Sequence, residues 1–324
     1  MSFESTGDSG TGTGAGRAVR VRLSPEVERA LSSDAGVVAL ESTILCHGLP
    51  FPANLETHLA AEEAVRREGA IPALIAVIDG VPRAGFSAAE AEVLARAGRS
   101  VRKATTRDLG ILAARRESGA TTVAATMSIA AAAGVRAFAT GGIGGVHRGA
   151  ESTFDVSADL LELSRTRVVV IASGAKLILD LPRTAEALET LGVPVIGFGT
   201  SELPAFWVRS SGLALETRVD DAGEIARVVL AHWAWPQAGG VLVANPVPEE
   251  AALPREEIEA AIERSLEAAR AAGVTGKAVT PFLLSRISEE TGGRTLAANR
   301  ALVVSNAAVA ARIAVGLAAD LPAL

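Results

Sequence analysis

Residues 168–198 read VVVIASGAKLILDLPRTAEALETLGVPVIGF and contain the pattern that decides the fold. A β-branched run at 168–173 is followed by an Ala-, Leu- and Glu-rich segment of helical period at 183–192 and by a second β-branched run at 193–198. Such alternation is typical of parallel strands that are joined by helical crossovers. The segment therefore predicts a strand–helix–strand unit.

The same alternation extends along the chain from Val37 onward. The predicted strands are 37–40, 73–78, 136–140, 168–173, 193–198 and 239–246. The predicted helices are 54–69, 87–98, 106–119, 157–166, 183–192, 222–235 and 255–273. We expect the apolar stretch 301–319 to form a buried helix and not a membrane span, because Asn306 and Arg312 interrupt it.

The pattern predicts one α/β domain with a mostly parallel sheet over residues 18–324, since no Pro/Ser-rich linker divides it. The Gly- and Ser-rich residues 1–17 are expected to be a disordered tail, because they lack the basic and apolar regions of a secretory signal. A single cysteine, Cys46, allows neither an intrachain disulfide nor a CxxC metal pair, which fits a cytoplasmic protein. A net charge of -6 without a basic run argues against a nucleic-acid polymer as partner.

Ligands of open parallel sheets bind at the carboxyl ends of the strands. Three predicted strand ends carry chemistry there: Glu41 ends one strand, Thr140 begins the glycine run TGGIGG, and Lys176 follows a third strand. Glycines after a strand let backbone N–H groups approach an anion, so this run is a candidate phosphate cradle. The alternative is a tight turn before a helix.

Ionisable residues follow the glycine run. Asp155 and Asp159 are one helical turn apart, beside His147, and Ser157 is a candidate N-cap. Two carboxylates in this position are candidate ligands for Mg²⁺ or Mn²⁺. Helix capping is the alternative explanation for at least one of them.

Two lysines stand out by their context. Lys176 has apolar flanks that would partly desolvate its amine and favour the neutral nucleophile, although a solvated surface lysine is the alternative. Lys103 precedes TTRD, a candidate helix N-terminus that would bind an anion together with Thr105 and Thr106. We assign Lys277 to a solvated turn.

The histidines are less informative than the lysines. His47 is next to Cys46, but adjacent residues rarely face one another, so a thiol–imidazole pair is not expected. His58 and His232 fall within predicted helices and are interpreted as structural.

Eight motifs together resemble the pseudouridine-5'-phosphate glycosidase family, which includes indigoidine synthase A-like proteins. The resemblance runs in unbroken order from about residue 24 to 318. The motifs are ALESTILCHGLPFPANLET, AVIDGVPRAGF, KATTRDLG, GATTVAATMSIA, ATGGIGGVHRGAESTFDVSADLLEL, VVVIASGAKLILDLPRTAEALETLGVPVIGFGT, PAFWVRSSG and LAANRALVVSNAAVAARIA.

The resemblance implies a three-layer α/β/α fold, a homotrimer, and the reversible cleavage of pseudouridine 5'-phosphate to uracil and ribose 5-phosphate with one Mn²⁺ per subunit. It implies Lys176 as nucleophile, Glu41 as proton donor and Asp155 as metal ligand. It adds Asp159, His147 and Lys103 as further catalytic residues. The substrate-binding residues that it implies are Lys103, Val123, Thr140, Ser157, Ala158, Asp159 and Asn299.

Two other functions remain open at the level of sequence. A Schiff-base lyase or aldolase acting on another sugar phosphate would keep Lys176 without a uracil site. A non-catalytic sugar-phosphate-binding protein is the second alternative. Release of uracil would distinguish a pseudouridine-5'-phosphate glycosidase from the lyase or aldolase, and any turnover would exclude the non-catalytic binding protein.

Overall fold

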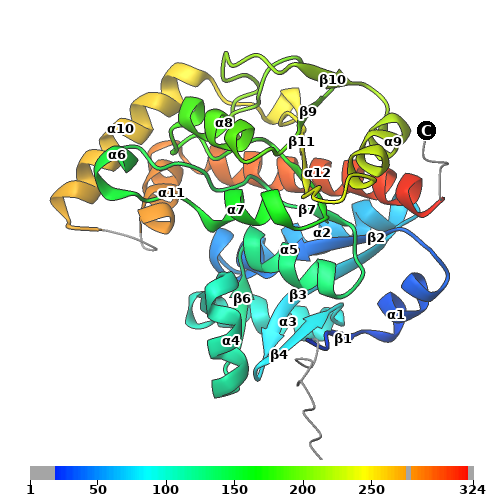
Figure 1. Ribbon diagram of the computed structural model, residues 1–324. Coiled ribbons are helices and arrows are strands. Elements are labelled where there is room, and N and C mark those ends of the chain that lie inside the picture. Colours follow the sequence, from blue (N-terminus) through cyan, green and yellow to red (C-terminus); the bar gives the residue numbers. More distant parts are fainter. Residues whose placement is uncertain (1–18, 275–278, 320–324) are drawn as a thin grey trace, which may run out of the picture.

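A mostly parallel sheet forms the centre of the protein (Figure 1). The computed structural model describes residues 19–274 and 279–319. In these ranges the strand order is β1-β4-β3-β2-β7-β8-β11-β9-β10, and β6 pairs with both β3 and β5. Among the strands of the described residues, only the pairings of β3 with β4 and with β6 are antiparallel. The strands are β1 (Arg22–Leu23), β2 (Val37–Glu41), β3 (Ile71–Ile78), β4 (Val81–Ala84), β5 (Arg102–Ala104), β6 (Gly119–Thr121), β7 (Ala137–Ala139), β8 (Val169–Ala172), β9 (Val195–Phe198), β10 (Thr217–Val219) and β11 (Val241–Ala244).

All six predicted strands are confirmed, as β2, β3, β7, β8, β9 and β11. Five strands in the described part of the chain escaped prediction because none of them is a continuous apolar run: they read RL, VPRA, RKA, GAT and TRV. In β4, Pro82 further weakens the strand signal. The predicted tail 1–17 and Lys277 lie outside the described residues.

The helices cover the sheet. They are α1 (Pro25–Ser32), α2 (Ala53–Arg67), α3 (Ala88–Ala97), α4 (Thr106–Arg115), α5 (Val123–Ala132), α6 (Ala150–Thr153), α7 (Ala158–Arg165), α8 (Leu181–Thr190), α9 (Ala222–Trp233), α10 (Arg255–Ala271), α11 (Val279–Glu290) and α12 (Arg294–Ala318). All seven predicted helices and the buried C-terminal helix are present. Helix α4 ends before the predicted residue 119, because Arg116 adopts a left-handed conformation (φ 54°).

The helices lie in two layers, so the expected three-layer arrangement is confirmed. The chain passes from β2 to β3 through α2, and from β7 to β8 through α7, in opposite directions across the sheet. Crossovers between parallel strands are right-handed, so α2 and α7 cover opposite faces. Helix α12 packs beside α2 and α9, whereas α5 packs on α7.

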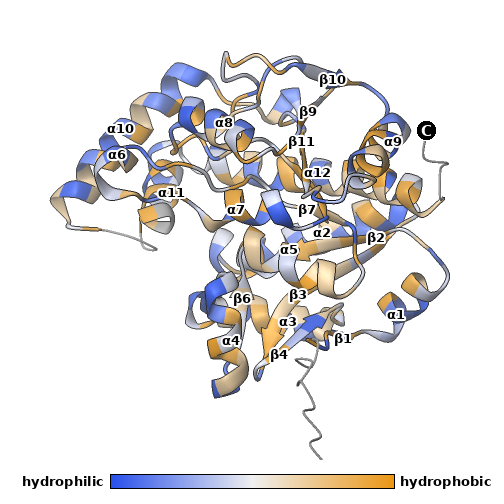
Figure 2. Cartoon of the chain, viewed as in Figure 1, coloured by the Kyte–Doolittle hydropathy of each residue, from blue (hydrophilic) through white to orange (hydrophobic). Residues whose placement is uncertain are grey.

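Helix α12 is long and apolar enough to cross a membrane by composition alone, but it packs on the sheet. Its Asn306 is fully buried and donates to the carbonyl oxygen of Thr140 at 2.7 Å. The Asn306 side chain also bonds those of Ser173 and Asn245, beyond the ends of β8 and β11. Asn306 therefore cross-links the ends of β7, β8 and β11. Elsewhere along much of α12, as on the sheet, hydrophobic residues predominate, in contrast to the mixed surface of α10 (Figure 2).

The chain reverses its direction across the sheet between β2 and β7. These strands are neighbours, with Leu40 opposite Ala139, although nearly 100 residues separate them in sequence. From β2 the chain continues toward one edge, and from β7 toward the other. Such a switch point leaves a crevice at the carboxyl ends of the strands, where α/β proteins bind ligands.

Candidate active site

A cavity of about 420 Å³ lies at the carboxyl ends of β2, β7 and β8. Thr140, one of the predicted site residues, lies behind Glu41 and not at the cavity surface. The other ten predicted residues line the cavity: Glu41, Lys103, Val123, His147, Asp155, Ser157, Ala158, Asp159, Lys176 and Asn299. The structure therefore brings together residues from most of the chain length.

Glu41 ends β2 and is 7% exposed. Its Oε1 accepts a hydrogen bond from Thr140 Oγ1 at 2.9 Å, across the β2–β7 pair. Burial raises the pKa of Glu41 from 4.5 to about 7, against the opposing effects of the Lys176 charge and the Thr140 hydrogen bond. A carboxyl group with this pKa exchanges a proton readily near neutral pH.

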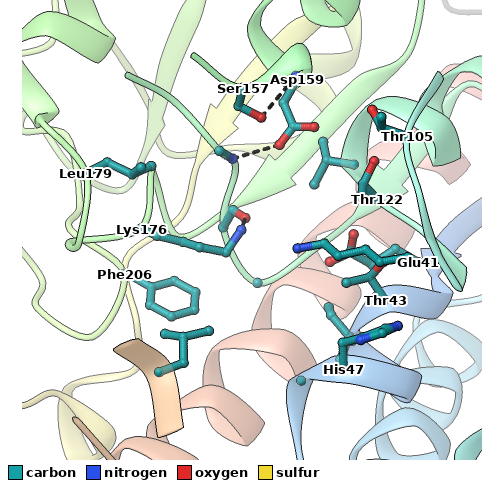
Figure 3. A pocket seen from close by; sticks show the side chains of 18 of the residues that line it. Glu41, Thr43, His47, Thr105, Thr122, Ser157, Asp159, Lys176, Leu179 and Phe206 are labelled. Atoms are coloured by element: carbon teal, nitrogen blue, oxygen red, sulfur yellow. Dashed lines mark hydrogen bonds between the residues drawn. The ribbon is translucent and has the colours of Figure 1, made fainter. Parts of the chain in front are cut away.

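Lys176 reaches the cavity from the loop after β8. Its Nζ donates to the carbonyl oxygen of Gly142 at 2.8 Å. Gly174 makes the turn before it with φ 71°, and a Cβ there would collide with the carbonyl oxygen of Pro204. The amine is thus half-buried and points across the cavity toward the side that carries Glu41 (Figure 3).

Three helices begin at the cavity wall. Thr105, Thr122 and Ser157 are the N-caps of α4, α5 and α7, and all three line the cavity. Lys103, half-buried on β5, lies on the same wall. Helix N-termini carry partial positive charge, which favours a phosphate, although Ala124 N of α5 and Asp159 N of α7 already donate to side-chain oxygens. The N-termini of α5 and α7 therefore lie on the same wall as the anion site expected at Lys103 and α4.

The glycine run packs tightly, and three of its N–H groups donate within the protein. Thr140 N donates to Ile171 O at 3.0 Å, Ile143 N to Gly174 O at 3.1 Å, and Gly144 N to Asp159 Oδ2 at 2.8 Å. A Cβ on Gly144 would collide with the Ser157 side chain. These three N–H groups therefore do not contribute to a phosphate cradle, and Gly144 is required for close packing.

Asp159 joins two walls of the cavity. Its Oδ1 accepts from Ala124 N in the first turn of α5 at 2.9 Å, while its Oδ2 accepts from Gly144 N. Ser157 caps α7 as predicted, by accepting from Asp159 N. Asp159 is 6% exposed. Through these two hydrogen bonds its carboxylate holds the glycine run against α5, in addition to any role that it has toward the substrate.

His147 and Asp155 lie together on a further wall. His147 N donates to Asp155 O at 3.0 Å. Burial lowers the pKa of the His147 imidazole, although the Asp155 charge opposes this, so the neutral ring is favoured. Within residues 19–274 and 279–319, no group of three or more His, Cys, Asp or Glu residues could hold a metal ion. Asp155 therefore fits a divalent cation that takes few protein ligands and keeps several water molecules, as Mg²⁺ commonly does.

Cys46 and His47 lie on a π-helical turn, Ile44–Gly48, and do not form a pair. The Cys46 thiol faces the carbonyl oxygen of Leu94, and burial raises the pKa of the thiol to about 12. His47 Nε2 lies 2.9 Å from Val101 O. The expectation that Cys46 is not a nucleophile agrees with this geometry, whereas His47 lines the cavity unpredicted.

Several other cavity residues had no assigned role in the sequence, notably Thr43, Thr122 and Phe206. Phe206 is buried with φ 62° and packs over Gly142. One compositional signal does point to the site: the chain has 28 arginines but only three lysines, and Lys103 and Lys176 both line the cavity.

The chain matches the family described as "Indigoidine synthase A like protein" over residues 26–316. It is 53% identical to the pseudouridine-5'-phosphate glycosidase of Escherichia coli K12 over 294 residues, 91% of this chain and 94% of that protein. It is 54% identical to the pseudouridine-5'-phosphate glycosidase of Paracoccus denitrificans over 299 residues, 92% of this chain and 98% of that protein.

Two solved structures share the fold. The prealnumycin C-glycosynthase AlnA in complex with ribulose 5-phosphate has a TM-score of 0.85 and 40% identity, covering 92% of this chain and 97% of its own. An indigoidine synthase A-like protein from Thermotoga maritima has a TM-score of 0.84 and 38% identity, covering 94% of this chain and 98% of its own. The resemblance seen in the eight motifs is thereby confirmed, and the chain belongs to the indigoidine synthase A-like family.

Proposed function

We propose that this protein is an enzyme that cleaves pseudouridine 5'-phosphate reversibly to uracil and ribose 5-phosphate. The observation that carries the proposal is that the Lys176 amine and the buried Glu41 carboxyl group line one cavity at the switch point of the sheet. The two relatives at 53% and 54% identity are named for the same activity.

The bond to be cleaved joins C1' of ribose to C5 of uracil, so no glycosidic oxygen is present to protonate. A lysine amine can supply the electrons instead. Lys176 Nζ attacks C1' as the ribose ring opens and O4' takes up a proton. After uracil C5 is protonated, the C1'–C5 bond breaks, its electron pair restores the uracil double bond, and the nitrogen lone pair forms a C1' iminium. Water then hydrolyses the iminium to ribose 5-phosphate and the free amine.

Glu41 is the proton donor of this scheme. Because its pKa is about 7, a substantial fraction is protonated at neutral pH, and the carboxylate formed accepts a proton back. Thr140 holds the carboxyl group at the β2–β7 junction. We assign Lys103 as a second group that moves protons, and His147 as a neutral imidazole beside the opened sugar.

The 5'-phosphate is bound where α4, α5 and α7 begin. Lys103 adds a full charge to the three helix ends, and the wall carries three N-cap hydroxyl groups. Ser157, Ala158 and Val123 lie at these N-termini and line the cavity, in keeping with their expected role in substrate binding.

Asp155 is the residue for a divalent cation, which we propose to be Mn²⁺. One carboxylate satisfies a hard cation when water and substrate oxygens complete its shell. When bound, the ion supplies positive charge that orients the oxygens of the opened sugar. The homotrimer and the cytoplasmic location implied by the resemblance and the composition remain predictions.

A Schiff-base enzyme for another pentose phosphate is the second candidate. AlnA, at 40% identity, is named a C-glycosynthase and was solved with ribulose 5-phosphate, which favours related chemistry with a different acceptor. Such an enzyme would form the lysine adduct without releasing uracil. Uracil release therefore separates the two candidates, and any turnover excludes a purely sugar-phosphate-binding protein.

The test is incubation with pseudouridine 5'-phosphate and Mn²⁺, with chromatographic detection of uracil. We expect Lys176→Arg to abolish uracil release, because a guanidinium has no accessible neutral nitrogen. Borohydride added with ribose 5-phosphate should leave a sugar-phosphate mass on the peptide that contains Lys176.

Two lysine variants control this experiment. Lys103→Arg keeps a cation on the phosphate wall and should still be trapped on Lys176, and Lys277→Arg tests the remaining lysine of the chain. An adduct that maps to Lys103, or near-normal uracil release by Lys176→Arg, would overturn the nucleophile assignment. Unphosphorylated pseudouridine should lose orders of magnitude in kcat/KM, because the remote phosphate contributes to transition-state binding.

A further inference from the structure

Trp207 is a fully buried side chain behind the cavity wall, where it contacts Phe206 and Asn299, which both line the cavity. Its segment is fastened on both sides: Phe206 N donates to Ser173 O at 2.9 Å, and Leu253 N donates to Trp207 O at 2.9 Å. The rings of Phe206 and Trp207 contact each other with centroids 5.0 Å apart. The indole is therefore held rigidly with respect to the end of β8.

The indole of Trp207 decides which way the Asn299 amide points. Trp207 Nε1 donates to Asn299 Oδ1 at 2.8 Å. An indole N–H is a donor only, so it must pair with the oxygen of the amide and never with the nitrogen. In the described part of the chain, no residue accepts a hydrogen bond from Asn299 Nδ2, and Asn299 lines the cavity. The geometry leaves the amide NH₂ to the ligand.

Asn299 belongs to the apolar side of the cavity. Leu302 and Val303 follow it on α12, and Phe206 completes this side, whereas the phosphate wall is formed by the starts of α4, α5 and α7. A flat pyrimidine ring matches apolar walls with one polar group, and its carbonyl oxygens are hydrogen-bond acceptors.

We propose that Trp207 is a positioning residue that holds Asn299 as a hydrogen-bond donor to a carbonyl oxygen of uracil. This inference rests on the proposed function for the identity of the ligand. Because Trp207 acts through Asn299, its contribution belongs to base recognition and not to the formation of the lysine adduct. A site with a fixed donor selects strongly for a ligand that carries an acceptor there.

The first experiment uses Trp207→Phe, which keeps an aromatic ring but lacks the N–H. In the synthetic direction we expect the KM for uracil to rise about three- to tenfold, the equivalent of one hydrogen bond. The KM for ribose 5-phosphate and the yield of its borohydride-trapped adduct should stay unchanged. Trp233→Phe is the matched control, because Trp233 Nε1 also donates one hydrogen bond, to Gly239 O at 2.9 Å in α9 and its following loop.

A double-mutant cycle separates positioning from general destabilisation. In an Asn299→Ala background, Trp207→Phe should change the KM for uracil by less than about twofold, since the partner is already absent. Asn299→Asp keeps an oxygen for Trp207 but replaces the donor by a second oxygen, so it should raise the KM for uracil at least tenfold. This variant provides the test if Trp207→Phe does not fold.

Three results would overturn the inference: a wild-type KM for uracil in Trp207→Phe or Asn299→Asp, an equal effect of Trp207→Phe with and without Asn299, or an equal rise in the KM for ribose 5-phosphate. Failure of the proposed function itself shows differently, because the wild-type protein would then release no uracil from pseudouridine 5'-phosphate.

Discussion

Replacing Glu41 by Gln is expected to abolish uracil release, and the stability of the variant relative to that of the wild-type protein should be greater at pH 8 than at pH 5. Burial raises the pKa of Glu41 from 4.5 to about 7, so the folded protein keeps a proton that the unfolded chain has already lost between these values. Wild-type stability therefore falls as the pH rises through this window, whereas a glutamine has no such dependence.

The magnitude follows from the two pKa values. The interval from 4.5 to about 7 corresponds to roughly 3 to 4 kcal/mol at about 1.4 kcal/mol for each pH unit, and roughly 2 to 3 kcal/mol of this falls between pH 5 and pH 8. Solvent screens this carboxyl group only weakly, because Glu41 is 7% exposed. At about 2 °C per kcal/mol for a chain of this size, the melting temperature of the variant relative to wild type should rise by roughly 5 °C between pH 5 and pH 8.

The assay is calorimetric melting of both proteins at pH 5, 6, 7 and 8, at one protein concentration. Glu267→Gln, at an exposed position of α10, is the control and should follow the wild-type protein at every pH. A difference between Glu41→Gln and wild type that stays constant with pH would refute the reasoning, as would a difference that shrinks as the pH rises.

Two further predictions concern the cavity. Thr140→Val removes the hydrogen bond that lowers the pKa of Glu41, so the alkaline limb of the kcat/KM profile for uracil release should move up by about one pH unit. Thr140→Ser keeps the hydroxyl group and should leave the limb in place, whereas an unmoved limb in the valine variant would contradict the link between Thr140 and the pKa of Glu41. Chelation should abolish uracil release and Mn²⁺ should restore it, with a weaker metal response in Asp155→Ala, and full activity of exhaustively chelated enzyme would exclude the metal site.

The central strands could be predicted from the sequence because each is a continuous apolar run buried on both faces. Residues 37–40 and 168–173 show this plainly, and the helices between such runs have one apolar face. Helix α5 escaped prediction for the opposite reason: residues 123–132 are apolar nearly all round, so they show no helical face.

Part of the site also followed from sequence alone. The rule that ligands bind at strand ends selected Glu41, Thr140 and Lys176, because a strand end is a local feature. The roles of the glycine run and Asp159 did not follow, since the chain pattern cannot show that Gly144 N donates to Asp159 or that Asp159 reaches α5.

Only the tertiary structure decided which of these residues meet. Thr140 contacts Glu41 because β7 lies beside β2, and Trp207 contacts Asn299 because the loop after β9 packs on α12. These partners are about 90 to 100 residues apart, and a hydrogen bond between them leaves no periodic trace in the sequence. The sequence determined the elements and the chemistry at their ends through local periodicity. The strand order, which depends on packing between distant segments, determined the site.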